Sequence, residues 1–358
     1  MRLQSIDALR ALAIVIMVAV HFSENLSGLT LPTQGTGAPM FAVLSGVSFH
    51  LWARGQEQRD VEPGLVTRRG VRRGLFLFGV GLLFNVLVWL PEDVFNWDVL
   101  TLIGTGLVVL TAARHAPSAL LLGAAGILIA FAPALQVTVG AIEYWVNPWF
   151  DYDWTLSDVL IGYVAAGFFP LFPWLALPLI GMAVGRWLYA DEGSPRARGM
   201  RLAATGFGLL VLSQVVVVAI SGLAGPDLHA QLGGRRMFPP TTGYVLTSIG
   251  TVLLLLGLLA RFVDREGAGP SLWRTLTTRF SRASFTLYLL HHVVHVWPLW
   301  ILAIARGEET TLYWRSALDQ PTALALAAAF LVLCVPLLGF MERRRIPSVE
   351  QLMRWFAD

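Results

Sequence analysis

Long apolar stretches recur along the whole chain, and they constrain its fold more than any other feature. A helix that crosses the hydrocarbon core of a bilayer needs about 20 mostly apolar residues. Only 14% of the residues are charged and 56% are hydrophobic, whereas about 25% are charged in an average soluble domain. The sequence therefore predicts an all-α, polytopic integral membrane protein with about 10 transmembrane helices. The expected spans are 7–23, 38–53, 74–90, 99–113, 118–140, 160–188, 202–224, 242–262, 283–305 and 321–341.

The sixth stretch is too long for one straight span, and it contains Pro170, Pro173 and Pro178. Proline fixes φ and lacks the backbone N–H that a helix interior needs. Non-helical backbone at membrane depth is tolerated only where protein or a water-filled cavity surrounds it. We therefore expect a broken helix or a re-entrant piece around residues 168–174, and two membrane pieces here would add one span to the count.

The placement of arginine predicts the orientation. All 26 basic residues are arginines, and basic residues concentrate in cytoplasmic loops. Counted from a cytoplasmic N-terminus, the arginine-rich segments after spans two, six, eight and ten fall on one side, and the opposite loops are mainly acidic. We expect a multi-pass protein of the cell membrane with both termini in the cytoplasm. Its transmembrane domain would cover 1–345, followed by a short amphipathic cytoplasmic tail over 346–358.

The composition also excludes several classes of function. A net charge of only +3 gives little support to a nucleic-acid partner. The single cysteine, Cys334, excludes an intrachain disulfide. The sequence has no glycine-rich nucleotide loop and no Cys/His cluster with zinc spacing, so we expect no bound metal.

The first span carries three ionisable residues on one face: Asp7, Arg10 and His21. His21 follows Arg10 by 11 residues, which is about three helical turns, or roughly 16 Å. Ionisable groups inside a membrane are costly and usually face a polar cavity or a partner, so this stripe predicts a functional site. In the alternative interpretation, Asp7 and Arg10 anchor the helix at the inner surface and His21 caps its outer end. The residues alone leave both interpretations open.

The two larger side chains of this stripe suit different tasks. His21 falls at the extracytoplasmic end of the span if Asp7 lies near the cytoplasm. An imidazole exchanges protons near neutral pH, so His21 can act as a general base towards a hydroxyl or an amine. It can equally be acylated transiently. Arg10 lies closer to the cytoplasmic end of the span, where its guanidinium group can bind a phosphate or a carboxylate with two N–H groups in a fixed fork.

Further candidates lie in span two and in the arginine-rich segment after it. Ser45 belongs to the small patch 45–48, which favours close packing of helices over chemistry. Arg54, Arg72 and Arg73 can bind the phosphates of a nucleotide-like donor. The enrichment of arginine in cytoplasmic loops explains the same residues without any ligand.

Span nine contains three histidines. His291 and His295 are four residues apart and share a helix face, with His292 beside them. This spacing can hold a transition metal, but no third clustered ligand accompanies the pair in the sequence. The pattern therefore favours a polar lining beside a buried active site.

These residues, in this order, resemble a known family. Arg10 and His21 match the R-x10-H motif of transmembrane acyltransferases, and residues 5–13 resemble their LDxLRGLA signature. Residues 169–186 resemble the FPLLPWLG…GxxxGR block of the heparan-α-glucosaminide N-acetyltransferase-like family. Residues 284–291 are similar to the SYxLYLLH segment of the wider superfamily, so the resemblance covers most of the chain.

The resemblance implies an integral membrane acyltransferase. It would move an acyl group, most simply acetyl, from acetyl-CoA at the cytoplasmic face to a glycan hydroxyl or amine at the outer face. The expected partners are acyl-CoA, a sugar or glycan acceptor and the lipid bilayer, and the sequence leaves a homodimer open. The catalytic residues would be His21, Arg10 and Asp7, and the donor would be bound by Arg10, Arg54, Arg72, Arg73, Ser45 and His291.

Two other classes of function remain to be weighed. A small-molecule transporter would also have intramembrane charges and a broken span, but the sequence shows no repeat between its halves. A non-catalytic membrane scaffold would leave Asp7, Arg10 and His21 without a reason to share a stripe.

Overall fold

Helices account for nearly all the regular structure in the computed structural model, which describes residues 3–89, 91–146, 149–190, 194–223, 234–264, 269, 271–309 and 315–358. The predicted ends at Leu90 and Ala224 lie outside the described residues. The chain forms two compact units. Unit 1 comprises residues 1–40 and 265–355, and unit 2 comprises residues 41–264 and 356–358.

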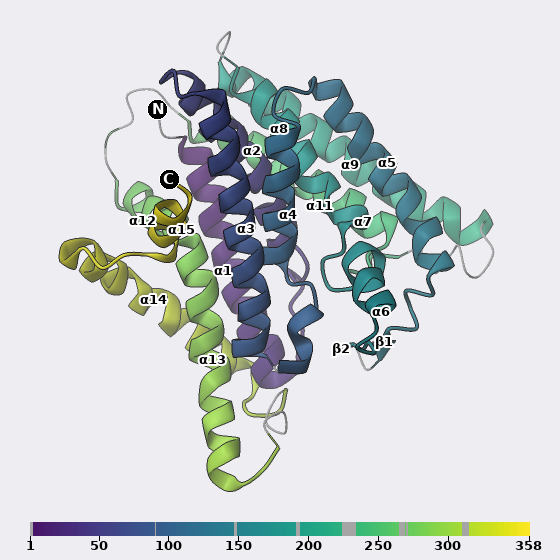
Figure 1. Ribbon diagram of the computed structural model, residues 1–358, viewed down its shortest axis with the longest axis vertical. Coiled ribbons are helices and arrows are strands. Elements are labelled where there is room, and N and C mark those ends of the chain that lie inside the picture. The colour runs from purple at the N-terminus through teal and green to yellow at the C-terminus, as the bar shows by residue number, and fades with distance from the viewer. Residues whose placement is uncertain are drawn as a thin grey trace. The chain divides into compact units, whose positions relative to one another are not determined.

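Unit 1 brings the two ends of the chain together. Its first helix, α1, packs against three helices from the last quarter of the chain, α12, α13 and α14. In Figure 1, α1 (purple) lies beside α13 (green). The helices are α1 (Gln4–Ser27), α12 (Leu272–Arg282), α13 (Ser284–Arg306), α14 (Gln320–Arg344) and α15 (Val349–Ala357), whose last residues belong to unit 2.

Unit 2 contains the helices of the middle of the chain. Its main helix pairs are α3 with α4, α5 with α8, and α9 with α11. An apolar core of Phe49, Leu110, Leu121 and Met182, among others, joins α2, α4, α5 and α8. The elements are α2 (Gly37–Glu57), α3 (Pro63–Val88), η1 (Pro91–Phe95), α4 (Val99–Ala112), α5 (Ser118–Thr138), β1 (Trp145–Val146), β2 (Trp149–Phe150), α6 (Leu156–Ile161), η2 (Gly162–Ala166), α7 (Leu171–Trp174), α8 (Ala176–Leu188), α9 (Pro195–Leu223) and α11 (Thr242–Phe262), and the two short strands pair in antiparallel.

Among the residues that the structure describes, eight segments are long and apolar enough to cross a membrane, so the chain is a multi-pass membrane protein. They correspond to eight of the ten predicted spans. The other two predicted spans, 38–53 and 99–113, are helical as well, as α2 and α4. The 14 residues of α4 measure about 21 Å, which is less than the roughly 30 Å core. The 21-residue α2 is long enough but is not one of the eight candidate spans. Crossing by α2 and α4 stays a prediction.

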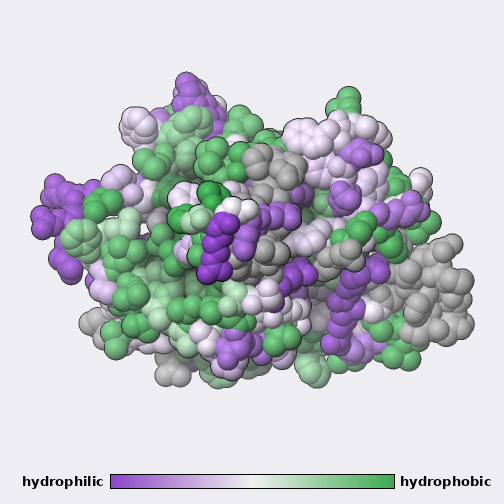
Figure 2. All heavy atoms as spheres, turned by 90° about the horizontal axis from the view of Figure 1, so that it is seen from below, coloured by the Kyte–Doolittle hydropathy of each residue, from purple (hydrophilic) through white to green (hydrophobic). Residues whose placement is uncertain are grey.

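Many large apolar side chains are exposed, and the face drawn in Figure 2 has broad hydrophobic areas among its polar ones. Leu120, Ile127 and Phe131 of α5 are exposed by 58–63%, which would be unfavourable in water. Contiguous exposed apolar surface of this kind indicates contact with lipid.

The break predicted in the sixth span is confirmed. The helix α6 continues into the π-helical turn η2, and the backbone then leaves helical geometry from Gly167 to Pro170. The one-turn helix α7 follows, with Phe172 in an extended conformation, before α8 begins at Ala176. Pro170 lies at the break, as the N-cap of α7, whereas Pro178 lies in the first turn of α8, where a missing N–H does not interrupt the helix.

The arginines after α2 differ from the prediction in one respect. We expected a loop over residues 54–73, but α2 extends to Glu57 and α3 already begins at Pro63. Arg68, Arg72 and Arg73 therefore lie on the first turns of a 26-residue helix. Such a helix is about 39 Å long and exceeds the hydrocarbon core. The arginines can thus stay at the membrane surface while the same helix enters the membrane.

The small patch in α2 serves close packing, as its sequence favoured. A methyl group on Gly46 would overlap the carbonyl oxygen of Pro178 in α8, and one on Gly181 would overlap the carbonyl oxygen of Val43. Small residues let two helix backbones approach in this way inside a membrane protein. The hydroxyl of Ser45 donates to the Ala42 carbonyl of its own helix at 2.7 Å.

Candidate active site

The polar face of α1 meets α12 and α13 through an ordered series of side-chain hydrogen bonds. The partners increase in number along both segments, so α1 runs parallel to α12 and α13. All of these residues belong to unit 1. The pairs are Gln4 with Thr277 (2.6 Å), Asp7 with Thr278 (3.2 Å), Arg10 with Ser281 (3.0 Å), His21 with His291 (2.8 Å) and Asn25 with His295 (2.8 Å).

His21 is the centre of a cluster of aromatic nitrogen rings. Its ring lies nearly parallel to that of His291, with centroids 5.1 Å apart, and 4.7 Å from that of His292. His291, His292 and His295 are 0–4% exposed, whereas His21 is only partly buried. His21 is therefore the least buried residue of the four histidines in this cluster.

The backbone around His21 is held by the segment that precedes α14. The last carbonyls of a helix have no partner inside it. In α1, the carbonyl of Asn25 accepts from the Arg315 N–H at 2.8 Å, and that of Leu26 accepts from the Leu318 N–H at 2.9 Å. Gly28 ends the helix with a left-handed φ of 69°, which glycine adopts without strain. These contacts fix the turn that follows His21.

The start of α13 is held by the C-terminal helix α15. The carboxylate of Glu350 accepts hydrogen bonds from the N–H groups of Phe285 (2.7 Å) and Thr286 (3.2 Å) and from the Thr286 hydroxyl (2.7 Å). The first N–H groups of a helix are otherwise unsatisfied, and a negative charge there also suits the helix dipole. Glu350 thereby fixes the helix that carries His291.

The nitrogen atoms of His21, His291 and His292 lie within 4.8 Å of one another, close enough to raise the question of a metal. Two ligands of a tetrahedral zinc, each about 2.05 Å from the ion, are about 3.3 Å apart. The facing nitrogens of His21 and His291 are 2.8 Å apart, which is a hydrogen-bond distance. The geometry therefore favours a hydrogen-bonded pair over a metal centre.

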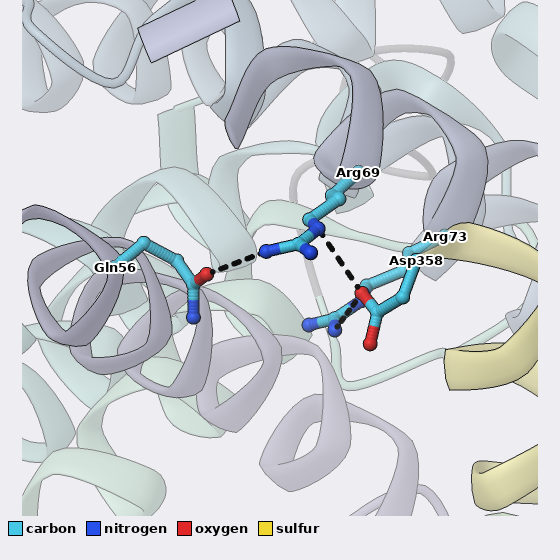
Figure 3. A network of polar contacts seen from close by, with 4 residues as sticks. All are labelled: Gln56, Arg69, Arg73 and Asp358. Atoms are coloured by element: carbon cyan, nitrogen blue, oxygen red, sulfur yellow. Dashed lines mark hydrogen bonds and ion pairs between the residues drawn. The ribbon is translucent and has the colours of Figure 1, made fainter. Parts of the chain in front are cut away.

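The other predicted site residues are in unit 2 and are described separately. Arg54 donates to the Tyr189 carbonyl at 2.7 Å. Arg73 lies over the ring of Trp52 at 4.5 Å and pairs with the carboxylate of Asp358 at 3.4 Å. Figure 3 shows Arg69 and Arg73 converging on that carboxylate, while Arg69 also donates to Gln56. Arginine pairs that hold one carboxylate have the geometry that also suits a phosphate. Arg72 lies on α3 and is partly buried.

The structure thus groups some predicted residues and separates others. His21 and His291 are in direct contact. Arg10 and Asp7 share their helix but lie roughly 16 Å and 21 Å from His21 along its axis, so they cannot touch the same reacting atom. No sequence pattern indicates the roles of Ser281 and Glu350, because each contacts a partner that is distant along the chain.

Together, the membrane helices and the hydrogen-bonded stripe of α1 define a multi-pass membrane protein with a histidine cluster inside one of its helical units. Residues 2–215, more than half of the chain, match the family model of the heparan-α-glucosaminide N-acetyltransferase catalytic domain. The chain belongs to this family of acetyl-CoA-dependent transmembrane acetyltransferases. A search of curated proteins gave no match.

The family assignment confirms the resemblance and decides between the classes of function. The chain is a membrane acetyltransferase, which disfavours the transporter and the scaffold. The matched residues include Arg10 and His21 but end within α9. The helices that contact the polar face of α1, α12 and α13, lie beyond them.

Proposed function

We propose that the protein transfers an acetyl group from cytoplasmic acetyl-CoA to a hydroxyl or amine of a glycan-like acceptor at the outer face of the membrane, with His21 at the reacting centre. The observation that carries this proposal is the placement of His21. It is the least buried member of a cluster of four histidines, on the stripe that also holds Arg10. A positioned imidazole is the side chain most often used to move a proton in acyl transfer.

The chemistry requires one free nitrogen on His21. As a general base, this nitrogen removes the proton from the acceptor O–H or N–H while the acceptor atom bonds to the acetyl carbon. The C–S bond of the thioester breaks, and the proton passes from His21 to the departing thiolate of CoA. As an acyl carrier, the same nitrogen attacks the acetyl carbon first, and the C–S bond breaks to release the CoA thiolate. In a second step the acceptor attacks the acetyl carbon, the N–C bond to His21 breaks, and the acceptor's proton is released, which balances protonation of the thiolate.

In this proposal, arginine side chains bind the acetyl donor, acetyl-CoA. Arg54, Arg72 and Arg73 would bind the phosphates of acetyl-CoA, and the grip of Arg69 and Arg73 on one carboxylate supports that role. Arg10 would act on the donor from the cytoplasmic half of α1, and Asp7 would hold α12 through Thr278. For Ser45 and His291, the observed contacts favour packing and contact with His21 over binding of the donor.

The parallel course of α1 and α13 supports the proposed topology. Two parallel membrane helices enter from the same side, so an odd number of crossings must separate them. If residues 156–188 cross once, then α2 and α4 either both cross or both do not. If both α2 and α4 cross, the chain has the ten predicted membrane spans, and both termini lie in the cytoplasm.

The direct test is acetyl transfer by the purified protein. We would incubate it in detergent with radiolabelled acetyl-CoA, with and without glucosamine-containing oligosaccharides and other glycans. We expect label in the glycan and release of CoA that depends on the acceptor. Release of CoA without any labelled acceptor would contradict the glycan proposal, and label that stays on the protein at His21 would identify an acyl-histidine.

Sidedness is tested by thiol labelling. The only native thiol, Cys334, is buried, so Cys334→Ser gives a clean background for Gln34→Cys and Gln58→Cys, both at exposed positions. With a membrane-impermeant maleimide on intact cells, position 34 should react, and position 58 should react only after permeabilisation. The reverse pattern would place His21 on the cytoplasmic side and rule out transfer across the membrane.

A further inference from the structure

The hydrogen bonds of the histidine cluster determine which ring nitrogen carries each proton. A backbone carbonyl can only accept a hydrogen bond. The Nδ1 of His291 lies 3.1 Å from the carbonyl oxygen of Leu287, so this nitrogen carries a proton and donates it. A buried unpaired charge is costly, so His291 is neutral, and its Nε2 then has a lone pair and no proton.

This assignment passes on to His21. The Nε2 of His291 faces the Nδ1 of His21 at 2.8 Å. Because His291 offers a lone pair there, the Nδ1 of His21 must be the donor. A neutral imidazole has one proton, so the Nε2 of His21 is left with its lone pair. That is the nitrogen that both versions of the proposed chemistry require.

The same arrangement recurs one turn further along the two helices. The Nδ1 of His295 donates to the carbonyl of His291 at 2.6 Å, and the Nε2 of His295 accepts from the amide of Asn25 at 2.8 Å. His291 and His295, four residues apart on α13, thus contact His21 and Asn25, which are four residues apart on α1. The repetition supports the assignment of protons, because Asn25 can donate to His295 only if that Nε2 is unprotonated.

We propose that His291 is a positioning residue that sets the tautomer of His21 and stabilises its protonated form during transfer. This role rests on the proposed function of His21. When His21 takes a proton on Nε2, its Nδ1–H still donates to His291, which spreads the new charge. In serine proteases a carboxylate orients the catalytic histidine in the same manner. Here a neutral imidazole, fixed by a backbone carbonyl, performs the task.

The proton assignment can be tested without any assay of activity. In protein labelled with ¹⁵N-histidine, two-bond ¹H–¹⁵N spectra distinguish the two neutral tautomers, and loss of signals in His21→Ala identifies the ring of His21. We expect Nδ1–H on both His21 and His291. An Nε2–H tautomer on His21 in the wild-type protein would overturn the proposal. So would one equivalent of a transition metal that is lost in His291→Gln, because the nitrogens would then be ligands.

Three variants test the consequence for the reaction. In His291→Leu the acceptor is gone, and we expect kcat to fall by about 10- to 1,000-fold with KM nearly unchanged, by analogy with removal of the orienting group in a protease triad. In His291→Gln the amide oxygen can still accept from His21, so we expect most of kcat to return. His295→Leu, one turn away, removes the equivalent bond to Asn25 and should leave kcat within about threefold of wild type.

The outcomes separate this inference from the proposed function. Equal losses of kcat in His291→Leu and His295→Leu, or no recovery in His291→Gln, would overturn the role of His291. If His291→Leu fails to fold, the comparison of His291→Gln with wild type and the wild-type spectra still decide the matter. An active His21→Ala protein would instead refute the proposed function and leave the tautomer assignment standing on the spectra alone.

Discussion

In unit 1, α1 meets α12 and α13 through a series of hydrogen bonds between polar side chains. In unit 2 the main helix pairs meet at glycines that bring backbones together, and the α9–α11 pair adds a hydrogen bond from Thr247 to Ser213 at 3.0 Å. The glycines of unit 2 that a methyl group would force against neighbouring backbone include Gly46 and Gly181 in the α2–α8 pair, Gly74 and Gly104 in the α3–α4 pair, and Gly206 and Gly250 in the α9–α11 pair. Both kinds of contact hold helices together in a membrane. Only the first is a series of proton donors and acceptors placed beside one another.

This difference teaches where chemistry can reside. A backbone crossing at glycine is tight but has no side chain that can accept a proton or orient a substrate. A seam of polar side chains is less favourable to bury, because each polar group must find a hydrogen-bond partner. We expect such a seam where its side chains take part in the reaction. Substitutions at His21 and its neighbours in the polar seam of unit 1 should therefore affect turnover, and substitutions at the glycine crossings of unit 2 should affect stability.

The largest expected effect is the loss of acetyl transfer in His21→Ala, which tests whether the polar seam of unit 1 carries the chemistry. His21→Ala removes the proposed base or carrier and should lower acetyl transfer by about 10²- to 10⁴-fold, with a melting temperature in detergent close to that of wild type. His115→Ala is the matched control, because His115 is exposed in the turn between α4 and α5. Full transfer activity in His21→Ala would remove the reason for assigning chemistry to unit 1.

Arg10→Lys keeps the charge on the polar stripe but loses the planar fork. We expect acetyl-CoA to bind about tenfold or more weakly, as a lost hydrogen bond to a charged group contributes about 1.5–3 kcal/mol. Calorimetric titration with CoA measures this. Ser281→Ala serves as the control, because it removes one hydrogen-bond partner of Arg10 within the protein but leaves the guanidinium. If both variants weaken binding equally, Arg10 acts only through the packing of α12.

Gly181→Ala probes the backbone crossing of unit 2. The added methyl group would press on the Val43 carbonyl of α2, and we expect a loss of about 1–3 kcal/mol in stability from overpacking. Gly126→Ala places the same methyl group on α5, where nothing lies within 4 Å, and should leave the melting temperature unchanged or slightly raised. Thermal unfolding of the two variants side by side is the measurement. A stable Gly181→Ala protein would show that the α2–α8 crossing is looser than described.

The smallest effect compares two helix starts. Glu350→Gln keeps the size and an acceptor oxygen but loses the charge at the N-terminus of α13, so we expect about 0.3–1 kcal/mol less stability. Glu62 stands at the N-cap of α3 and makes no capping hydrogen bond, so Glu62→Gln should have no measurable effect on the melting temperature. Equal shifts in the two variants would mean that Glu350 contributes only through the overall charge of the protein.

Much of the local structure could be read from the sequence. The apolar lengths placed all ten predicted segments on helices, and the prolines located the break after Ala166. The 3.6-residue period put Asp7, Arg10 and His21 on one face. These features depend only on neighbouring residues, through hydrogen bonding within the segment and the cost of burying polar groups in lipid. For the same reason the sequence missed the early start of α3, because its arginines interrupt the apolar run without interrupting the helix.

By itself, then, the sequence determined a polytopic helical membrane protein whose first span carries an acetyltransferase motif, as the family match confirms. Only the tertiary structure decided which residue orients His21. Its partner, His291, lies 270 residues away along the chain, and Glu350 fixes the start of the helix that carries this partner. Helical periodicity shows which face of a helix is polar. Packing across the whole unit decides which other helix that polar face contacts, because every buried donor must find an acceptor.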